Sequence, residues 1–169
     1  GSRSVSIADR IFKKKDNVVL KSKLIAQKKS EKQIEDEYAE KAKKIEEITG
    51  EKFSTEELKK FIDAQKKLEV DIDLTQGWET TQFFSLQQIG KTAVVNVNNK
   101  HKFYDKLYQP IAEKLEQSSL EIVDLMLIAW ARLEDELSVT DIKTNDFIKI
   151  RERWGQRLSE LIEEQEKLD

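Results

Sequence analysis

Residues 18–49 form a long run without glycine or proline, in which apolar side chains recur at steps of three and four. This spacing places them on one narrow stripe of an α-helix, while glutamate and lysine alternate on the other faces. The stripe consists of Ile34, Tyr38, Ala42, Ile45 and Ile48. A stripe this thin over such a length is typical of a coiled-coil seam, so we expect one long helix that ends at Gly50.

A second helix is predicted directly after this one. Ser54 and Glu57 have the spacing of a capping box, in which each side chain bonds the backbone amide of the other residue. The short loop between the helices predicts an antiparallel hairpin over residues 18–69, because short connections join antiparallel neighbours. We expect this hairpin to protrude as an arm, preceded by a flexible basic N-terminus at residues 1–17.

Residues 70–169 are predicted to form an α+β body. The segment 70–74 alternates with the period of a half-buried strand, and two further strand-like runs flank a turn at Gly90 and Lys91. The helix at 120–137 is apolar nearly all round, which predicts a central core helix with the β-element packed under it. A last helix is predicted over 145–168, with these residues on its inner face: Phe147, Ile150, Trp154, Leu158 and Leu161.

The composition favours a helix-dominated α+β protein over other classes. Charged residues make up 37% of the chain, and five glycines and one proline are too few for a turn-rich sandwich or barrel. The absence of cysteine excludes disulfides and the common structural zinc sites. No apolar run reaches the roughly 18 residues of a membrane span, so we expect a cytoplasmic module, cut from a larger protein, that contacts no membrane.

Charge is divided unevenly along the chain. Residues 1–32 hold ten Lys or Arg and three Asp or Glu, a net +7, which leaves −10 for the remainder of a chain whose total is −3. The basic segment predicts contact either with the phosphate backbone of a nucleic acid or with an acidic protein surface. The candidate phosphate contacts are Lys13, Lys14, Lys15, Lys21, Lys28 and Lys29.

No complete catalytic, cofactor or metal site is predicted. His101 is the single histidine, so a two-histidine metal site cannot form, and a hydrogen-bonded structural histidine is the expected role. The triplet Gly90-Lys91-Thr92 lacks the upstream glycine of a phosphate-binding loop and lies between strands. We therefore expect no enzyme activity from this chain.

Residues 83–161 also carry a family pattern. Its parts are strand-like runs at 83–86 and 92–98, His101-Lys102-Phe103-Tyr104, the apolar helix 122–130 with Arg132-Leu133-Glu134, and Arg151-Glu152-Arg153-Trp154. In this order they resemble the region C-terminal to the ATP-binding domain of uncharacterised bacterial and phage GHKL-class ATPases, relatives of gyrase B, MutL and the large heat-shock chaperone. In that family a strand ending in Asn-x-x-His-Pro-Phe-Tyr precedes a core helix and a final Arg-x-x-Trp helix. Here Lys102 stands in place of the proline.

The resemblance implies a role downstream of an ATPase domain. The ATP-binding motifs of that class do not occur in this sequence, so the implied module is a non-catalytic transducer or dimerisation arm that does not bind ATP tightly. The expected partners are a second copy, through the stripe at 34–48, or the adjoining ATPase domain. The alternative is a free-standing helical scaffold or adaptor whose basic N-terminal segment contacts a nucleic-acid backbone.

Overall fold

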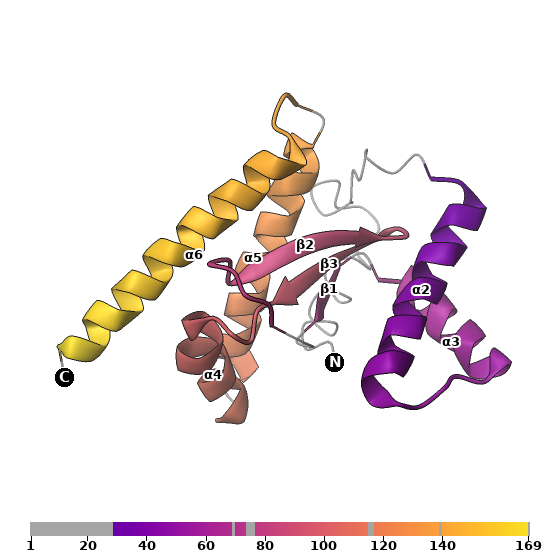
Figure 1. The fold of residues 1–169 in the computed structure, drawn as a ribbon, viewed down its shortest axis with the longest axis horizontal. Helices are drawn as coiled ribbons and strands as arrows, with labels where there is room; N and C mark the ends of the chain where they lie inside the picture. Colours follow the sequence, from indigo (N-terminus) through magenta and orange to yellow (C-terminus); the bar gives the residue numbers. More distant parts are fainter. Residues whose placement is uncertain (1–28, 69, 74–76, 115–116, 139, 169) are drawn as a thin grey trace.

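The computed structural model describes residues 29–68, 70–73, 77–114, 117–138 and 140–168. In these ranges a three-stranded sheet lies among helices (Figure 1). The elements are α2 (Glu31–Thr49), α3 (Thr55–Lys66), β1 (Val70–Asp73), β2 (Phe84–Ile89), β3 (Thr92–Val97), a π-helical turn η2 (Tyr104–Tyr108), α4 (Gln109–Glu113), α5 (Gln117–Leu137) and α6 (Thr144–Lys167). The predicted helix-dominated α+β fold is confirmed.

The sheet has β3 at its centre, with β1 parallel to it on one side and β2 antiparallel on the other. The β2–β3 turn is at Gly90 and Lys91, as predicted, and Gly90 has a positive φ of 57°. A Cβ on Gly90 would lie 2.3 Å from the ring of Tyr38. Glycine at this position therefore allows the positive φ of the turn, and its lack of a side chain allows α2 to approach the turn closely.

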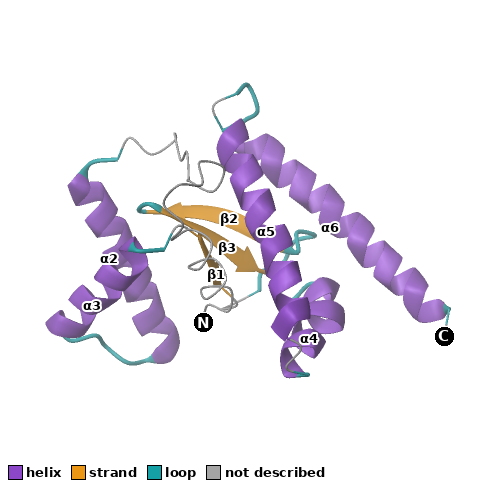
Figure 2. Ribbon diagram, turned by 180° about the vertical axis from the view of Figure 1, so that it is seen from behind, coloured by secondary structure: helices purple, strands orange, loops and turns teal. Residues whose placement is uncertain are grey.

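One face of the sheet is apolar and lies under α5 (Figure 2). Alternate strand residues point to this face, and Ile72, Phe84 and Val95 are each 0% exposed. Buried α5 residues, including Leu120 and Leu127, complete one continuous core. The prediction that the β-element packs under the helix at 120–137 is confirmed.

The helical pair α2–α3 begins and ends where the sequence places its signals. The Gly50 N–H donates to the Glu46 carbonyl at 2.8 Å, and Gly50 has a φ of 76°, so it forms the expected C-cap. Both bonds of the capping box between Ser54 and Glu57 are present. The predicted N-terminus at 1–17 and the first part of the predicted long helix, 18–28, lie outside the described residues.

The helix α2 is fastened to the second face of the sheet. The Tyr38 hydroxyl lies 2.9 Å from the Thr92 hydroxyl, and the Lys41 ammonium lies 3.2 Å from the buried Asp71 carboxylate. The predicted helical pair is thus present, and these contacts hold its first helix against the sheet. Helices cover both faces of the sheet as a result.

The inner face of α6 differs from the prediction. Phe147 is buried as expected, and Leu158 packs against the core. Trp154 also packs its ring on Phe83, although it is 39% exposed. Ile150 and Leu161 are 45% and 67% exposed, and Arg151 and Gly155 take the inner positions in their place. A Cβ on Gly155 would lie 1.8 Å from the Thr81 carbonyl oxygen, so only glycine allows this approach of α6. Close backbone contact and the paired charge of Arg151 have turned the helix relative to its apolar stripe.

Candidate functional site

Two neighbouring helices keep large apolar side chains in contact with solvent. Scattered single residues of this kind are normal on protein surfaces, but these follow each helix at steps of four and seven and so form rows. We call them together the α5–α6 face, which consists of Ile122, Met126 and Leu133 on α5 and Ile150, Trp154 and Leu161 on α6, each at least 39% exposed.

A tryptophan pair joins the two rows. The ring centroids of Trp130 on α5 and Trp154 on α6 are 5.0 Å apart. The ring of Trp154 also lies edge-on to Phe83 at 4.9 Å, which fixes it to the core beneath. Met126 and Leu133 lie one turn to either side of Trp130, so the exposed rows meet at the tryptophan pair and form one surface.

A buried polar network lies beside this pair and fixes the two helices together. The Arg151 guanidinium, 4% exposed, donates from Nη1 to both carboxylate oxygens of Glu134 at 2.5 Å and from Nε to Gln82 at 3.0 Å. The indole N–H of Trp130 donates to the same carboxylate. A charge buried in this way is tolerated because it is fully paired. The network preorganises the α5–α6 face.

His101 anchors α6 from the opposite side. Its Nε2 lies 2.9 Å from the Gly155 carbonyl oxygen, and its Nδ1 accepts from the Phe103 backbone N–H at 3.0 Å. This pattern requires the neutral tautomer with the proton on Nε2. Burial lowers the pKa of His101 and nearby Lys102 adds to that effect, while the bond to Gly155 opposes it. As expected, the histidine has a structural role.

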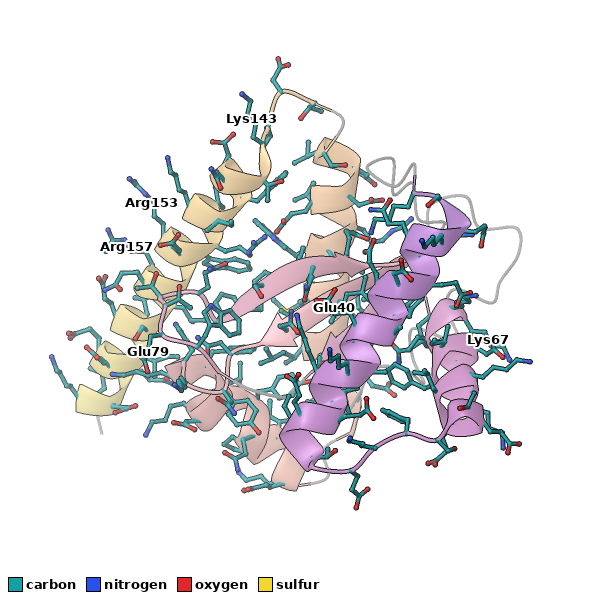
Figure 3. All side chains as sticks on the ribbon, turned by 45° about the vertical axis from the view of Figure 1, so that its right-hand side comes forward. Glu40, Lys67, Glu79, Lys143, Arg153 and Arg157 are labelled. Atoms are coloured by element: carbon teal, nitrogen blue, oxygen red, sulfur yellow. The ribbon has the colours of Figure 1, made fainter. Side chains whose placement is uncertain are left out.

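Charges of opposite sign border the α5–α6 face. Arg153 and Arg157 project from α6 into solvent (Figure 3), and Arg157 is ion-paired with Glu160 on the same helix. On α5 the exposed Glu136 follows Leu133 by three residues. An apolar centre with a polar rim is the usual composition of a protein–protein interface.

Most of the predicted dimer stripe on α2 is buried within the chain itself. Ile34, Tyr38 and Ala42 are 4%, 0% and 0% exposed, because α3 and the sheet cover them. Ile45 is half-buried, and Ile48 alone of the five is exposed, at 53%. The prediction that this stripe is open to a second copy is corrected for the three buried residues.

Most of the predicted phosphate contacts cannot be placed. Lys13, Lys14, Lys15, Lys21 and Lys28 lie outside the described residues. Lys29 is described, and its ammonium contacts the Glu37 carboxylate at 2.7 Å and the Gly90 carbonyl at 3.3 Å. Lys29 therefore ties the start of α2 to the β2–β3 turn.

The sequence does not reveal the α5–α6 face, because α5 is apolar nearly all round and this pattern predicts burial on every side. A signal is nevertheless present in the spacing of apolar residues. Met126 and Leu133 are seven residues apart, and so are Ile122 and Ala129. That is the period of a helix-docking seam.

Within the described ranges, no group of three or more His, Cys, Asp or Glu side chains is placed to hold a metal ion. Over the same ranges, no helix combines the length and hydropathy that crossing a membrane requires. No protein-family model, no curated protein and no solved structure matches this chain.

Proposed function

We propose that this chain is a non-catalytic transducer and dimerisation module of a larger GHKL-type ATPase, and that two copies meet through the α5–α6 face. The observation that carries the proposal is the row of exposed apolar side chains on each side of the Trp130–Trp154 pair. Contiguous apolar surface on a soluble protein marks an interaction site. Tryptophan is among the residues that contribute most to such interfaces.

The charged border favours a second copy as the partner. In a two-fold dimer the same surface serves both chains, so each feature must find its complement within that surface. The exposed arginines at 153 and 157 border the face on α6, and the exposed Glu136 borders it on α5. A two-fold axis that sets α6 of one chain on α5 of the other brings these opposite charges together.

The proposed place in a larger machine rests on the family resemblance of residues 83–161. A module of this kind passes the movement of an adjoining ATPase domain to its partner and carries no phosphate cradle itself. Titration calorimetry of the chain with ATP and magnesium is expected to show no binding at micromolar concentrations. Micromolar affinity would contradict the non-catalytic role.

Sedimentation equilibrium tests the dimer. The unmodified chain is expected to exceed its monomer mass of 19.8 kDa at high micromolar concentration. A double variant, Met126→Glu with Leu133→Glu, places four charges in the centre of the interface and is expected to be monomeric, with unchanged circular dichroism. Ile48→Glu, on the exposed end of the α2 stripe, is the matched control and should leave the mass unchanged.

Three outcomes would count against this proposal. A strictly monomeric unmodified chain excludes the dimer. Dissociation by Ile48→Glu alone moves the interface to α2. A dimer that dissociates completely between low and high salt indicates an interface held by charge, since screening acts over about 10 Å at 0.1 M salt and leaves apolar contacts intact.

The basic segment supports a second candidate function, an adaptor that contacts nucleic acid. Its observation is the net charge of +7 in residues 1–32. Anisotropy with a labelled DNA duplex at several salt concentrations tests it. Replacement of Lys13, Lys14 and Lys15 by alanine should reduce the salt dependence of the logarithm of affinity by about 0.9 for each lost phosphate contact. Equal binding by both proteins contradicts it.

A further inference from the structure

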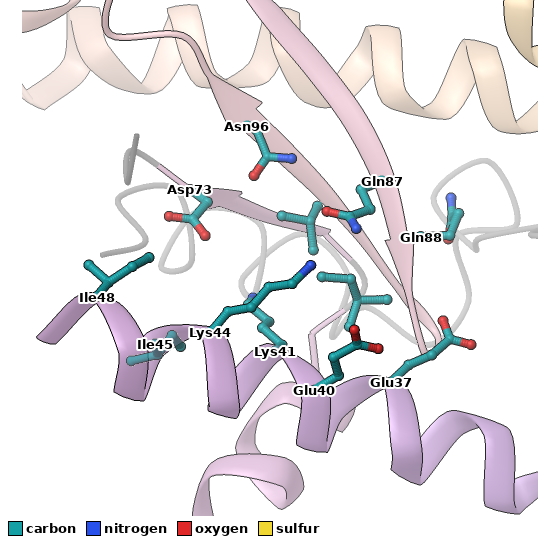
Figure 4. A pocket seen from close by; sticks show the side chains of 12 residues that line it. Glu37, Glu40, Lys41, Lys44, Ile45, Ile48, Asp73, Gln87, Gln88 and Asn96 are labelled. Atoms are coloured by element: carbon teal, nitrogen blue, oxygen red, sulfur yellow. The ribbon is translucent and has the colours of Figure 1, made fainter. Parts of the chain in front are cut away.

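A groove separates the last turns of α2 from the face of the sheet that α2 covers (Figure 4). Tyr38, near the middle of α2, touches the sheet directly, whereas Ile48 near the end of the helix is 53% exposed. The groove has a volume of about 190 Å³. Its lining comes from α2, β2 and β3, with Asp73 contributed by β1.

The groove has an apolar wall. Ile45 and Ile48 form it on the helix, and Val94 and Ile89 form it on the sheet. Ile48 leaves more than half of its surface open, so this wall accepts further apolar contact. Burying aliphatic carbon here is favourable, because it removes apolar surface from water.

Two charges in the groove are not used by the fold. Glu40 and Lys44 are one helical turn apart, and both side chains reach from α2 toward the sheet (Figure 4). Among the described residues, neither forms an ion pair within 4.0 Å, although this spacing on a helix permits one. Their neighbours are engaged: Glu37 with Lys29 at 2.7 Å and Lys41 with Asp71 at 3.2 Å.

The side of the groove that the sheet forms also carries neutral hydrogen-bonding groups. Gln87 on β2 and Asn96 on β3 turn their amides into the groove (Figure 4). Each amide offers both donors and an acceptor. Behind Lys41, the Oδ1 atom of buried Asp71 has no hydrogen-bond partner within the part of the chain that the structure describes. The Gln87 and Asn96 amides therefore give this wall hydrogen-bonding groups for a ligand, whereas Asp71 lies behind the lining and is not part of it.

We propose that this groove binds a small zwitterion with an aliphatic side chain, an amino acid of the leucine type. The ligand carboxylate pairs with the Lys44 ammonium, and the ligand ammonium pairs with the Glu40 carboxylate. The aliphatic side chain lies against Ile45 and Ile48. At about 190 Å³ the groove is below the roughly 300–1,000 Å³ of sites for drug-sized ligands, which favours a small ligand over a nucleotide.

The test is a titration of the whole ¹⁵N-labelled chain with L-leucine, followed by amide chemical shifts. The amides of Lys44, Ile48 and Asn96 are expected to move with saturation. Lys44→Met and Glu40→Gln should each weaken binding about tenfold or more, because a bond to a charged group is lost. The matched controls on the same helix are Lys43→Met and Glu47→Gln, which are exposed and outside the groove.

Two blocked ligands assign the two ends. Leucinamide lacks the carboxylate, so Lys44→Met should not weaken its binding further. N-acetyl-leucine lacks the ammonium, so Glu40→Gln should not weaken its binding further. The proposal is overturned if leucine moves no groove amide at the highest concentration used, or if the control variants weaken binding as much as the groove variants. Circular dichroism of every variant separates lost binding from lost folding.

Discussion

The two faces of the sheet are covered by different means. Toward α5, thirteen buried residues of the described ranges form one apolar cluster that includes the strands and four α5 side chains. Toward α2, the cluster formed by the residues that the structure describes is smaller and consists of Ile34, Tyr38 and Ile62. A hydroxyl pair and a lysine–aspartate pair complete the contact. We infer that apolar burial on the first face supplies most of the stability, while directional polar contacts on the second set where the helix lies.

The largest expected effect comes from placing a charge in the α5 cluster. Leu127 is 3% exposed, so Leu127→Asp buries an unpaired carboxylate among apolar side chains. The cost is several kcal/mol, comparable to the whole stability of a small domain, and the body should unfold. Far-UV circular dichroism and urea unfolding measure this.

The neighbouring residue provides the control for this substitution. Met126 is 64% exposed, and Met126→Asp is expected to keep the fold. If both variants unfold, α5 is not divided into a buried and an open side, and the comparison between its two faces is wrong.

The next effect comes from the ion pair that locks α6 to α5. Arg151→Met leaves the Glu134 carboxylate, whose side chain is 11% exposed, without its main partner. Removing one member of a buried pair costs about 3–5 kcal/mol, so the urea midpoint should fall markedly. The double variant Arg151→Met with Glu134→Leu should recover much of this loss, because no buried charge remains. Arg153→Met, on the exposed side of α6, should change the midpoint little.

Local signals in the sequence predicted the elements well. Gly50, Ser54 with Glu57, and the Gly90 turn act through backbone conformation and short-range bonds, which depend on neighbouring residues alone. The rotation of α6 could not be predicted in the same way. It depends on the contact of Gly155 with Thr81 and of Arg151 with Glu134, and these partners are distant in the sequence.

The candidate sites follow the same rule. The spacing of apolar residues predicts the stripe on α2. That spacing does not show whether other parts of the same chain cover the stripe. Tyr38 is buried against Thr92, which is 54 residues away in the sequence. Its side chain is therefore not available to a second copy. Exposure of the α5–α6 face and of the groove likewise depends on which helix surfaces the rest of the folded chain covers.

A smaller effect is expected on the α2 side. Tyr38→Phe keeps the ring but removes the hydroxyl, which accepts from the Lys91 N–H at 3.0 Å and contacts Thr92. Because the Thr92 hydroxyl can still donate its one hydrogen to a backbone carbonyl, that of Gln65 or Leu68, the expected loss is only about 1–2 kcal/mol. Tyr104→Phe is the control, because the Tyr104 ring is partly exposed and packs against the apolar cluster under α5, away from α2. If urea unfolding shows the same loss of stability for Tyr38→Phe and Tyr104→Phe, the Tyr38 hydroxyl has no special role in holding α2 to the sheet.

The smallest effect is a dependence of stability on pH through His101. Its pKa is lowered in the folded chain, chiefly by burial, so the unfolded chain binds the proton more readily. Stability from this group is therefore complete above about pH 6.5, the ordinary histidine value, and is lost as the pH falls below it. His101 is the single histidine, so urea midpoints between pH 7.5 and 5.5 report on it with little contribution from carboxylates. His101→Gln, which cannot titrate but can still donate to the Gly155 carbonyl, should give a flatter profile. An equally steep profile in that variant would show that the link between α6 and residue 101 does not depend on the neutral imidazole.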